Sequence, residues 1–154
     1  MSTADESRPV RAEDAFDVEA TAAWLRDHAE DFRDDLVGKP EVRQFPGGAS
    51  NLTYLLRYPD RDLILRRAPM GTKARGAHDM HREFFIQSQL GPVLPYVARM
   101  IGFCDDDSVL GGDFYVMERI DGVIPRSEWP SDVPLSPEQA RQLCLNVVEV
   151  YAEL

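Results

Sequence analysis

A short segment of small residues, Phe45-Pro46-Gly47-Gly48-Ala49-Ser50-Asn51, has the composition of an anion-binding loop. Glycine adopts positive φ angles and lets a ligand approach the backbone closely. Successive amides in such a turn can form a concavity for a phosphate group, and Ser50 and Asn51 add side-chain donors. We therefore predict a phosphate-covering loop in which Gly47, Gly48, Ser50 and Asn51 contact the ligand. An ordinary hairpin loop is the alternative, because short glycine-rich motifs often arise by chance.

A cation and a carboxylate further along the chain could complete such a site. Alternation along an expected strand at 62–67 places Ile64 and Arg66 on one face. Glu83 follows Met80 by three residues on an expected helix, on or beside its apolar side, where an unpaired carboxylate is costly. We predict that Arg66 and Glu83 meet between sheet and helix, where a fixed guanidinium can bind phosphate oxygens. A purely structural ion pair, or two unrelated surface groups, are the alternatives.

The segment that could contact a purine is an expected strand at 114–120 followed by the break Asp121-Gly122. Backbone groups exposed at such a break can hydrogen-bond the edge of a base, and Ile64 and Met117 could supply apolar walls. A core strand followed by an ordinary turn would have the same residue pattern, so a purine-contacting segment and a purely structural strand both stay open.

The composition of the chain is that of a soluble globular protein. It has 154 residues, of which 44% are hydrophobic and 29% charged, enough for one domain. No apolar run is long enough to span a bilayer and the first residues lack the features of a signal peptide, so we expect a cytoplasmic protein without a membrane partner. Cys104 and Cys144 lie in apolar segments without metal-ligand spacing and are expected to be reduced core residues.

The charge of the chain is unevenly distributed. Its net charge of −10 argues against nucleic-acid binding. Residues 57–82 nevertheless hold seven basic and three acidic residues, a local charge of +4. This basic segment follows the glycine segment, where a polyphosphate would need a counter-charge. A solvated surface patch is the alternative.

The elements that must position these residues are an antiparallel sheet and its helices. An acidic, proline-containing stretch at 1–13 is expected to be a disordered tail. Good N-caps at Asp17 and Asp79 each begin a helix. Turns rich in glycine or proline separate five expected strands, at 41–45, 52–58, 62–67, 97–104 and 114–120. The sequence thus predicts an α+β lobe at 14–120, with a five-stranded antiparallel sheet, an N-terminal helix and a helix packed on the sheet.

The C-terminal residues 121–154 predict a hinge, a linker and one long helix. Ser136-Pro137-Glu138-Gln139 has the pattern of a capping box with proline at the first helical position. The apolar stripe of this helix includes the last residue, Leu154, so we expect an incomplete second lobe. An uncovered stripe of this kind is also expected to self-associate or to be sheltered by a neighbour.

Taken in order, these motifs resemble the N-terminal lobe of the protein-kinase-like fold, in its aminoglycoside phosphotransferase and choline-kinase branch. Within that branch they resemble the phosphotransferase domain associated with acyl-CoA dehydrogenases. The resemblance extends over roughly residues 15–154. The residues that carry it are Gly47-Gly48-Ala49-Ser50-Asn51, Leu63-Ile64-Leu65-Arg66-Arg67-Ala68-Pro69, Arg82-Glu83-Phe84, Leu110-Gly111-Gly112-Asp113-Phe114-Tyr115-Val116-Met117-Glu118 and Asp121-Gly122.

The resemblance implies ATP-dependent phosphoryl transfer to a hydroxyl of a small molecule, with ATP and Mg²⁺ as cofactors. By the family pattern, the loop at 47–51 covers the ATP phosphates and Arg66 takes the position of the nucleotide-binding lysine. Glu83 would orient Arg66, and Glu118 to Ile120 would form the hinge that contacts adenine. Arginine departs from the pattern, because its side chain reaches differently from that of lysine.

The family's catalytic residues are not found in this sequence. Such enzymes use an H-x-D-x-x-x-x-N-like loop and a later Asp for Mg²⁺, and none of His28, His78 and His81 begins that motif. Asp105-Asp106-Asp107 lacks the spacing of a calcium loop and favours a solvated turn. We therefore expect a nucleotide-binding part with no catalytic residue or metal ligand, inactive by itself. The alternatives are a non-catalytic kinase-like module that pairs with a partner chain, and a structural domain that binds nothing.

Overall fold

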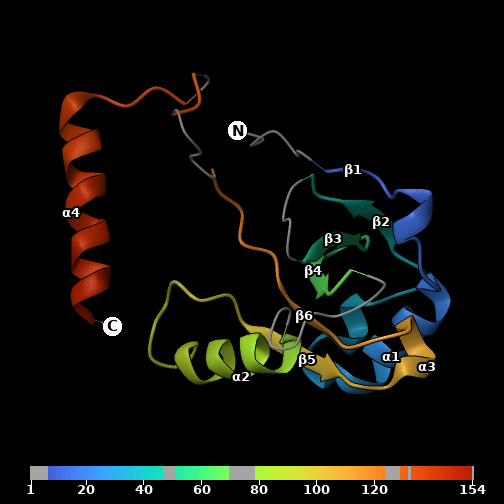
Figure 1. Ribbon diagram of the computed structural model, residues 1–154. Helices are drawn as coiled ribbons and strands as arrows, with labels where there is room; N and C mark the ends of the chain where they lie inside the picture. Colours follow the sequence, from blue (N-terminus) through green and yellow to red (C-terminus); the bar gives the residue numbers. More distant parts are fainter. Residues whose placement is uncertain (1–6, 47–50, 70–78, 124–128, 132, 154) are drawn as a thin grey trace. The chain divides into compact units, whose positions relative to one another are not determined.

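The computed structural model describes residues 7–46, 51–69, 79–123, 129–131 and 133–153. The chain divides into two compact units, residues 1–121 and 122–154 (Figure 1). The first unit contains a mixed α+β arrangement around one sheet, and the second contains one long helix.

All strands of the described chain belong to a single antiparallel sheet. Along the sheet their order is β1-β2-β3-β4-β6-β5. Their bounds are β1 Arg8–Pro9, β2 Glu41–Gln44, β3 Leu52–Arg57, β4 Asp62–Arg67, β5 Met100–Cys104 and β6 Phe114–Glu118. The helical segments are η1 Ala12–Asp14, α1 Val18–His28, η2 Glu30–Asp35, α2 Met80–Leu90, α3 Asp107–Leu110 and α4 Pro137–Glu153.

The sheet has six strands, so the prediction of five was one too few. The additional strand, β1, lies in the segment expected to be a disordered tail. Polar residues beside β1 form hydrogen bonds with residues distant in the sequence, and the local composition does not reveal these bonds. The Arg43 guanidinium donates to the Ser7 hydroxyl and carbonyl, both at 2.8 Å, and the Gln44 amide donates to the buried Asp14 carboxylate at 2.8 Å. These bonds hold residues 7–14 against β2.

One face of the sheet packs against α1 and η2. As predicted, α1 begins at the N-cap Asp17, whose side chain accepts from the Ala20 amide at 3.0 Å. The helix ends at His28 and is followed by the 3-10 helix η2. Apolar side chains of both helices join those of three central strands in one core. Its fully buried members include Leu25, Leu36, Tyr54, Leu56, Leu63, Leu65, Phe114 and Val116.

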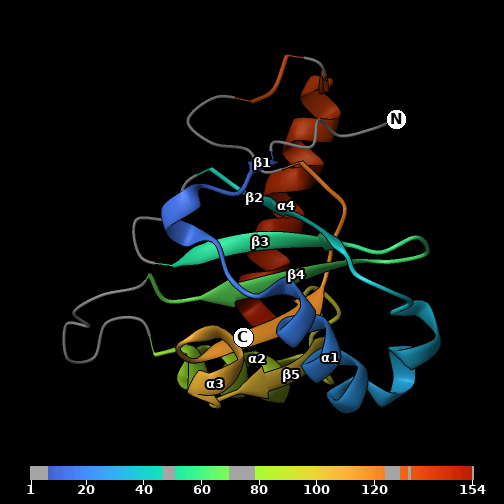
Figure 2. The same ribbon diagram turned by 90° about the vertical axis from the view of Figure 1, so that its right-hand side faces the viewer.

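The other face of the sheet carries α2, so that α1 and α2 lie on opposite faces (Figures 1 and 2). The Asp79 side chain caps α2 by accepting from the Arg82 amide at 2.8 Å. Strand β4 alternates as predicted, because Leu63 and Leu65 lie in the core beneath α1 while Arg66 contacts α2. This alternation decides which side chains of β4 face the candidate site.

The second unit confirms the predicted start of the last helix. The Ser136 amide donates to the Gln139 side chain at 2.8 Å, and the Gln139 amide donates to the Ser136 hydroxyl at 3.2 Å, which is a reciprocal capping box. None of the residues Pro137–Glu153 is buried. Cys144, on this helix, is therefore exposed rather than a core residue, whereas Cys104 is buried as expected, and both are free thiols. Within the described ranges, no helix has the length and hydropathy needed to cross a membrane.

Candidate functional site

The candidate site is built around an ion pair between β4 and α2. Arg66 projects from β4 toward α2, and Glu83 projects from the first turn of α2 toward the sheet. Arg66 Nη1 and Glu83 Oε2 are 3.4 Å apart, which confirms the predicted contact. The two side chains are 30% and 31% exposed, so the pair is partly screened from water but open to a ligand.

Tyr115 of β6 lies at the centre of this pair. The antiparallel register places Tyr115 opposite Arg66. Its hydroxyl donates to Glu83 Oε2 at 3.1 Å and accepts from Arg66 Nη1 at 3.2 Å and from Gln87 Nε2 at 3.2 Å. Burial raises the pKa of Tyr115, an effect only partly offset by the Arg66 charge. The hydroxyl therefore keeps its proton at neutral pH and remains a donor to Glu83.

Both carboxylate oxygens of Glu83 have protein donors. The buried Asn51 side chain donates to Oε1 at 2.8 Å, while Oε2 contacts Arg66 and Tyr115. A carboxylate held in this way fixes the guanidinium that it contacts. We name the five residues Asn51, Arg66, Glu83, Gln87 and Tyr115 the arginine cluster.

The predicted site also includes glycine-segment residues and two apolar residues of the sheet. Gly47, Gly48 and Ser50 lie outside the described residues. Ile64 is buried and pairs with Met117 across β4 and β6. By the alternation of the two strands, these apolar side chains lie on the same face as Arg66 and Tyr115.

Glu118 and Ile120 do not join the arginine cluster. Glu118 Oε1 lies 3.2 Å from Arg61 Nη1, and the Arg61 guanidinium also bonds to Asp35 of η2 at 2.7 Å. The Glu118 side chain therefore belongs to the α1 and η2 face, and its amide donates to the Arg99 carbonyl at 2.9 Å. Ile120 is 62% exposed just beyond β6.

Sequence reasoning gave no role to Tyr115 or Gln87, although both contact the predicted pair. Gln87 follows Glu83 by four residues, so helical periodicity alone places it one turn further along the same side of α2. Tyr115 alternates with Met117, which places it on the correct face of β6. Its position opposite Arg66 depends on strand register, however, and the sequence carries no local signal for that register.

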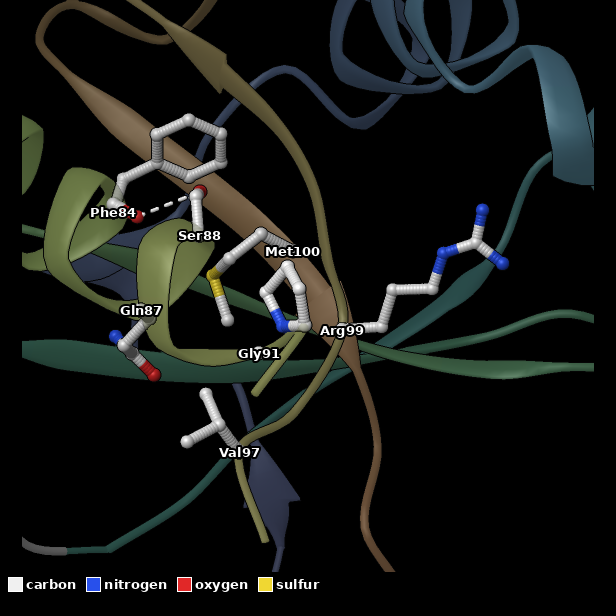
Figure 3. A pocket seen from close by; sticks show the side chains of 8 residues that line it. Phe84, Gln87, Ser88, Gly91, Val97, Arg99 and Met100 are labelled. Carbon is white, nitrogen blue, oxygen red and sulfur yellow. Dashed lines mark hydrogen bonds between the residues drawn. The ribbon is translucent and has the colours of Figure 1, made fainter. Parts of the chain in front are cut away.

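A cavity of about 400 Å³ borders the cluster between α2 and β5. Figure 3 shows side chains of α2 and of the following segment around it. The lining residues are Phe84, Gln87, Ser88, Gly91, Pro92, Val97, Arg99 and Met100. The Arg99 guanidinium points away from the other labelled side chains (Figure 3). It lies 4.6 Å from the centroid of the Phe32 ring. Gln87 therefore belongs both to the cavity wall and to the arginine cluster.

Comparison with known proteins identifies the fold that carries this cluster. A family model described as the phosphotransferase enzyme family matches residues 41–154. The chain belongs to the phosphotransferase enzyme family. A crystal structure from Ralstonia eutropha, of a protein provisionally named an aminoglycoside phosphotransferase, superposes with a TM-score of 0.61 at 34% identity and covers 80% of this chain. The predicted kinase-like lobe is thus confirmed.

Curated relatives of this phosphotransferase-family chain are named as acyl-CoA dehydrogenase family members. Mouse family member 10 is 35% identical over 152 residues, or 96% of the chain, and human family member 11 is 33% identical over 140 residues, or 90%. The chain spans only 13% and 18% of these two relatives, and 33% of the Ralstonia structure. The predicted likeness to a phosphotransferase domain associated with acyl-CoA dehydrogenases is confirmed.

Proposed function

We propose that this chain is the nucleotide-binding part of an ATP-dependent phosphotransferase, which phosphorylates a hydroxyl group of a small molecule. Family membership supports the class of reaction. The observation that carries the nucleotide role is the 3.4 Å contact between Arg66 and Glu83, because it presents a fixed cation on the sheet face next to α2. A guanidinium in this state is suited to the oxygens of a phosphate chain.

The proposal assigns a part of the nucleotide to each group of residues. Arg66 binds phosphate oxygens while Glu83 and Asn51 hold it in place. Ile64 and Met117 form an apolar wall for the adenine ring. The remaining predicted contacts are Gly47, Gly48 and Ser50 around the phosphates, and the backbone from Glu118 to Ile120 at the adenine edge.

The donors of the arginine cluster suit an anion better than a metal ion. Both Glu83 oxygens are occupied by protein donors, and no group of three metal-binding side chains was found among the described residues. Mg²⁺ would therefore enter with the nucleotide, where it neutralises charge on the phosphates. Since the 154 residues contain no H-x-D-x-x-x-x-N motif, we propose that they bind ATP without transferring its phosphate by themselves, and that they do so in the cytoplasm.

Calorimetric titration of the chain with ATP and Mg²⁺ tests the nucleotide role. Wild-type chain is expected to bind, and Arg66→Ala to bind about 10- to 100-fold more weakly, because a hydrogen bond to a charged group contributes about 1.5–3 kcal/mol. Arg82→Ala is the matched control, since it removes the same charge from an exposed position of α2. Equal affinities of Arg66→Ala and wild type would refute the assignment of Arg66.

A second candidate function is a non-catalytic module that pairs with another protein chain. The observation that favours it is the exposure of large apolar side chains on α4, among them Val147 at 48% and Tyr151 at 75%. A chain that binds no ATP in the titration, yet forms a stable complex with one partner, would support this candidate over the first.

A further inference from the structure

Apolar side chains form much of the wall of the cavity between α2 and β5. They come from α2, from β5 and from the segment that joins them, and they are Phe84, Pro92, Val97 and Met100 (Figure 3). The volume of about 400 Å³ is in the range of small-molecule sites, which measure about 300–1,000 Å³. The cavity can therefore hold the apolar body of a molecule with about ten to fifteen non-hydrogen atoms.

The side-chain oxygen of Gln87, Oε1, accepts no hydrogen bond from the described residues. The carboxamide nitrogen uses both of its hydrogens, on the Glu83 carbonyl at 3.3 Å and on the Tyr115 hydroxyl at 3.2 Å. These two bonds fix the orientation of the carboxamide, and in Figure 3 its oxygen points toward the side of Val97. Oε1 keeps accessible surface, because it is not one of the buried polar atoms that lack a partner. A ligand in the cavity can therefore reach it.

The side chains of the wall that carry hydrogen-bond donors are Gln87, Ser88 and Arg99, and each is engaged elsewhere. The Ser88 hydroxyl donates to the Phe84 carbonyl at 2.8 Å, which leaves only its oxygen lone pairs for a ligand (Figure 3). The Arg99 guanidinium pairs with Asp31 of η2 and points away from the other labelled side chains (Figure 3). These side chains therefore offer a ligand acceptor oxygens, and they offer no free donor to a phosphate or a carboxylate.

We propose that this cavity binds an uncharged small molecule with an apolar body and a hydroxyl group, and that the hydroxyl donates to Gln87 Oε1. An acceptor oxygen beside apolar surface is stabilised by a donor and not by an apolar contact. A cation would lose its water without gaining a carboxylate, because the lining contains none. None of the lining residues is assigned to the nucleotide, so the inference goes beyond the proposed function and does not depend on it.

Four probes with the same apolar body test the class of ligand. They are 3-phenylpropan-1-ol, its methyl ether, 3-phenylpropanoate and 3-phenylpropylammonium, and only the first is an uncharged donor. Each is titrated into the 154-residue chain while ¹⁵N–¹H NMR follows the Gln87 side-chain amide and the Val97 backbone amide. We expect the alcohol to bind with a Kd of about 0.1–1 mM. The ether is expected to bind about tenfold more weakly, and the two charged probes more weakly than the ether.

Three variants test the place of the ligand. Gln87→Leu removes the acceptor at similar size, so it should weaken the alcohol about tenfold and change the affinity of the ether by less than about twofold. Gln89→Leu is the matched control, because Gln89 is an exposed residue of α2 outside the cavity wall, and it should keep the preference for the alcohol. Val97→Trp places a large side chain in the cavity and should abolish binding of both probes.

Each outcome supports the inference or overturns part of it. A Gln87→Leu chain that still prefers the alcohol would overturn the assignment of Oε1, and a charged probe that binds as well as the alcohol would overturn the ligand class. Absence of binding by the alcohol, or shifts confined to residues outside the wall, would overturn the site. Thermal melts identify any unfolded variant, and the wild-type shifts locate the probe without a substitution. The ATP titration remains a separate test of the nucleotide role.

Discussion

Arg66 and Arg67 are neighbours in the sequence, yet β4 sends them to opposite faces of the sheet and into different environments. Arg66 is partly exposed beside α2, whereas Arg67 is 2% exposed on the α1 face. The Arg67 guanidinium donates to the Tyr54 hydroxyl at 3.1 and 3.2 Å and to the Asp14 carbonyl at 2.7 Å. A buried charge is tolerated only with such partners. Arg67 therefore fastens the N-terminal segment to the sheet and is not available to a ligand at the arginine cluster.

The Tyr54 hydroxyl is expected to matter for stability because it contacts this buried charge. It accepts from Arg67 and donates to the Asp14 carbonyl at 2.9 Å. Tyr54→Phe leaves the guanidinium short of an acceptor and should lower the free energy of unfolding by about 2–3 kcal/mol. Urea denaturation followed by circular dichroism measures the difference.

Tyr58→Phe serves as the control for that measurement. The Tyr58 hydroxyl is buried without a partner among the described residues. Removing it should leave the free energy of unfolding unchanged or raise it by about 1 kcal/mol, because an unsatisfied polar group is removed from the core. Equal destabilisation by the two substitutions would show that the Arg67 contacts contribute nothing specific.

At the scale of elements, α1 packs closely against strands β5 and β6 of the sheet. Trp24 of α1 packs edge-on against Phe114, with ring centroids 4.9 Å apart. A methyl group added at Gly102 of β5 would lie 3.0 Å from the Trp24 ring. Gly102 lies at an irregularity in the pairing of β5 with β6, which leaves room for the indole.

Gly102→Ala is therefore expected to displace Trp24 and to lower the free energy of unfolding by about 1–3 kcal/mol, as overpacking of a core does. Gly122→Ala is the control, since no described atom outside its chain neighbours lies within 4 Å of its added methyl group, and it should change stability by no more than about 0.5 kcal/mol. Chemical denaturation of both variants provides the comparison. A Gly102→Ala protein as stable as wild type would show that α1 can shift away from β5 at little cost.

Charged side chains also connect elements near the end of β6. Arg61, just before β4, contacts both Asp35 of η2 and Glu118 of β6, and its guanidinium lies 4.5 Å from the Phe32 ring centroid. This connection explains why the Glu118 side chain is turned away from the arginine cluster. The contribution of the segment after β6 to a nucleotide site would then come from its backbone.

At the scale of the whole molecule, the two units differ in how completely their apolar surfaces are covered. The sheet unit has a buried core and also exposes some apolar side chains, such as Phe85 and Val93, whereas no described residue of α4 is buried and Leu143, Val147 and Tyr151 are at least 40% exposed. These residues follow one another at intervals of four on a single stripe. An exposed stripe of this kind is a site of association.

The 154-residue chain is accordingly expected to self-associate at high concentration, and Val147→Glu to reduce that association by placing a charge on the stripe. Sedimentation velocity measures both. Gln142→Glu adds the same charge away from the stripe and should leave association unchanged. A wild-type chain that stays monomeric at high concentration would contradict this prediction.

Much of the molecule was predictable from the sequence because the signals are local. Asp17, Asp79 and Ser136 each cap a helix as predicted, since capping depends on residues within one turn. Alternation in β4 correctly predicted that Ile64 and Arg66 lie on the same face of the sheet, because alternation also depends only on neighbouring residues. The contact of Arg66 with Glu83 followed from the cost of leaving either charge unpaired near the core.

The tertiary structure decided what depends on partners distant in the sequence. The ordered residues 7–14 rest on bonds to Arg43 and Gln44 that composition cannot reveal. Tyr115 meets Arg66 only because β6 pairs with β4 in one register, and a shift by one residue would turn its hydroxyl to the other face. The sequence by itself therefore determined which residues carry charge and which face they occupy, whereas strand register determined the hydrogen bonds that give Arg66 its orientation.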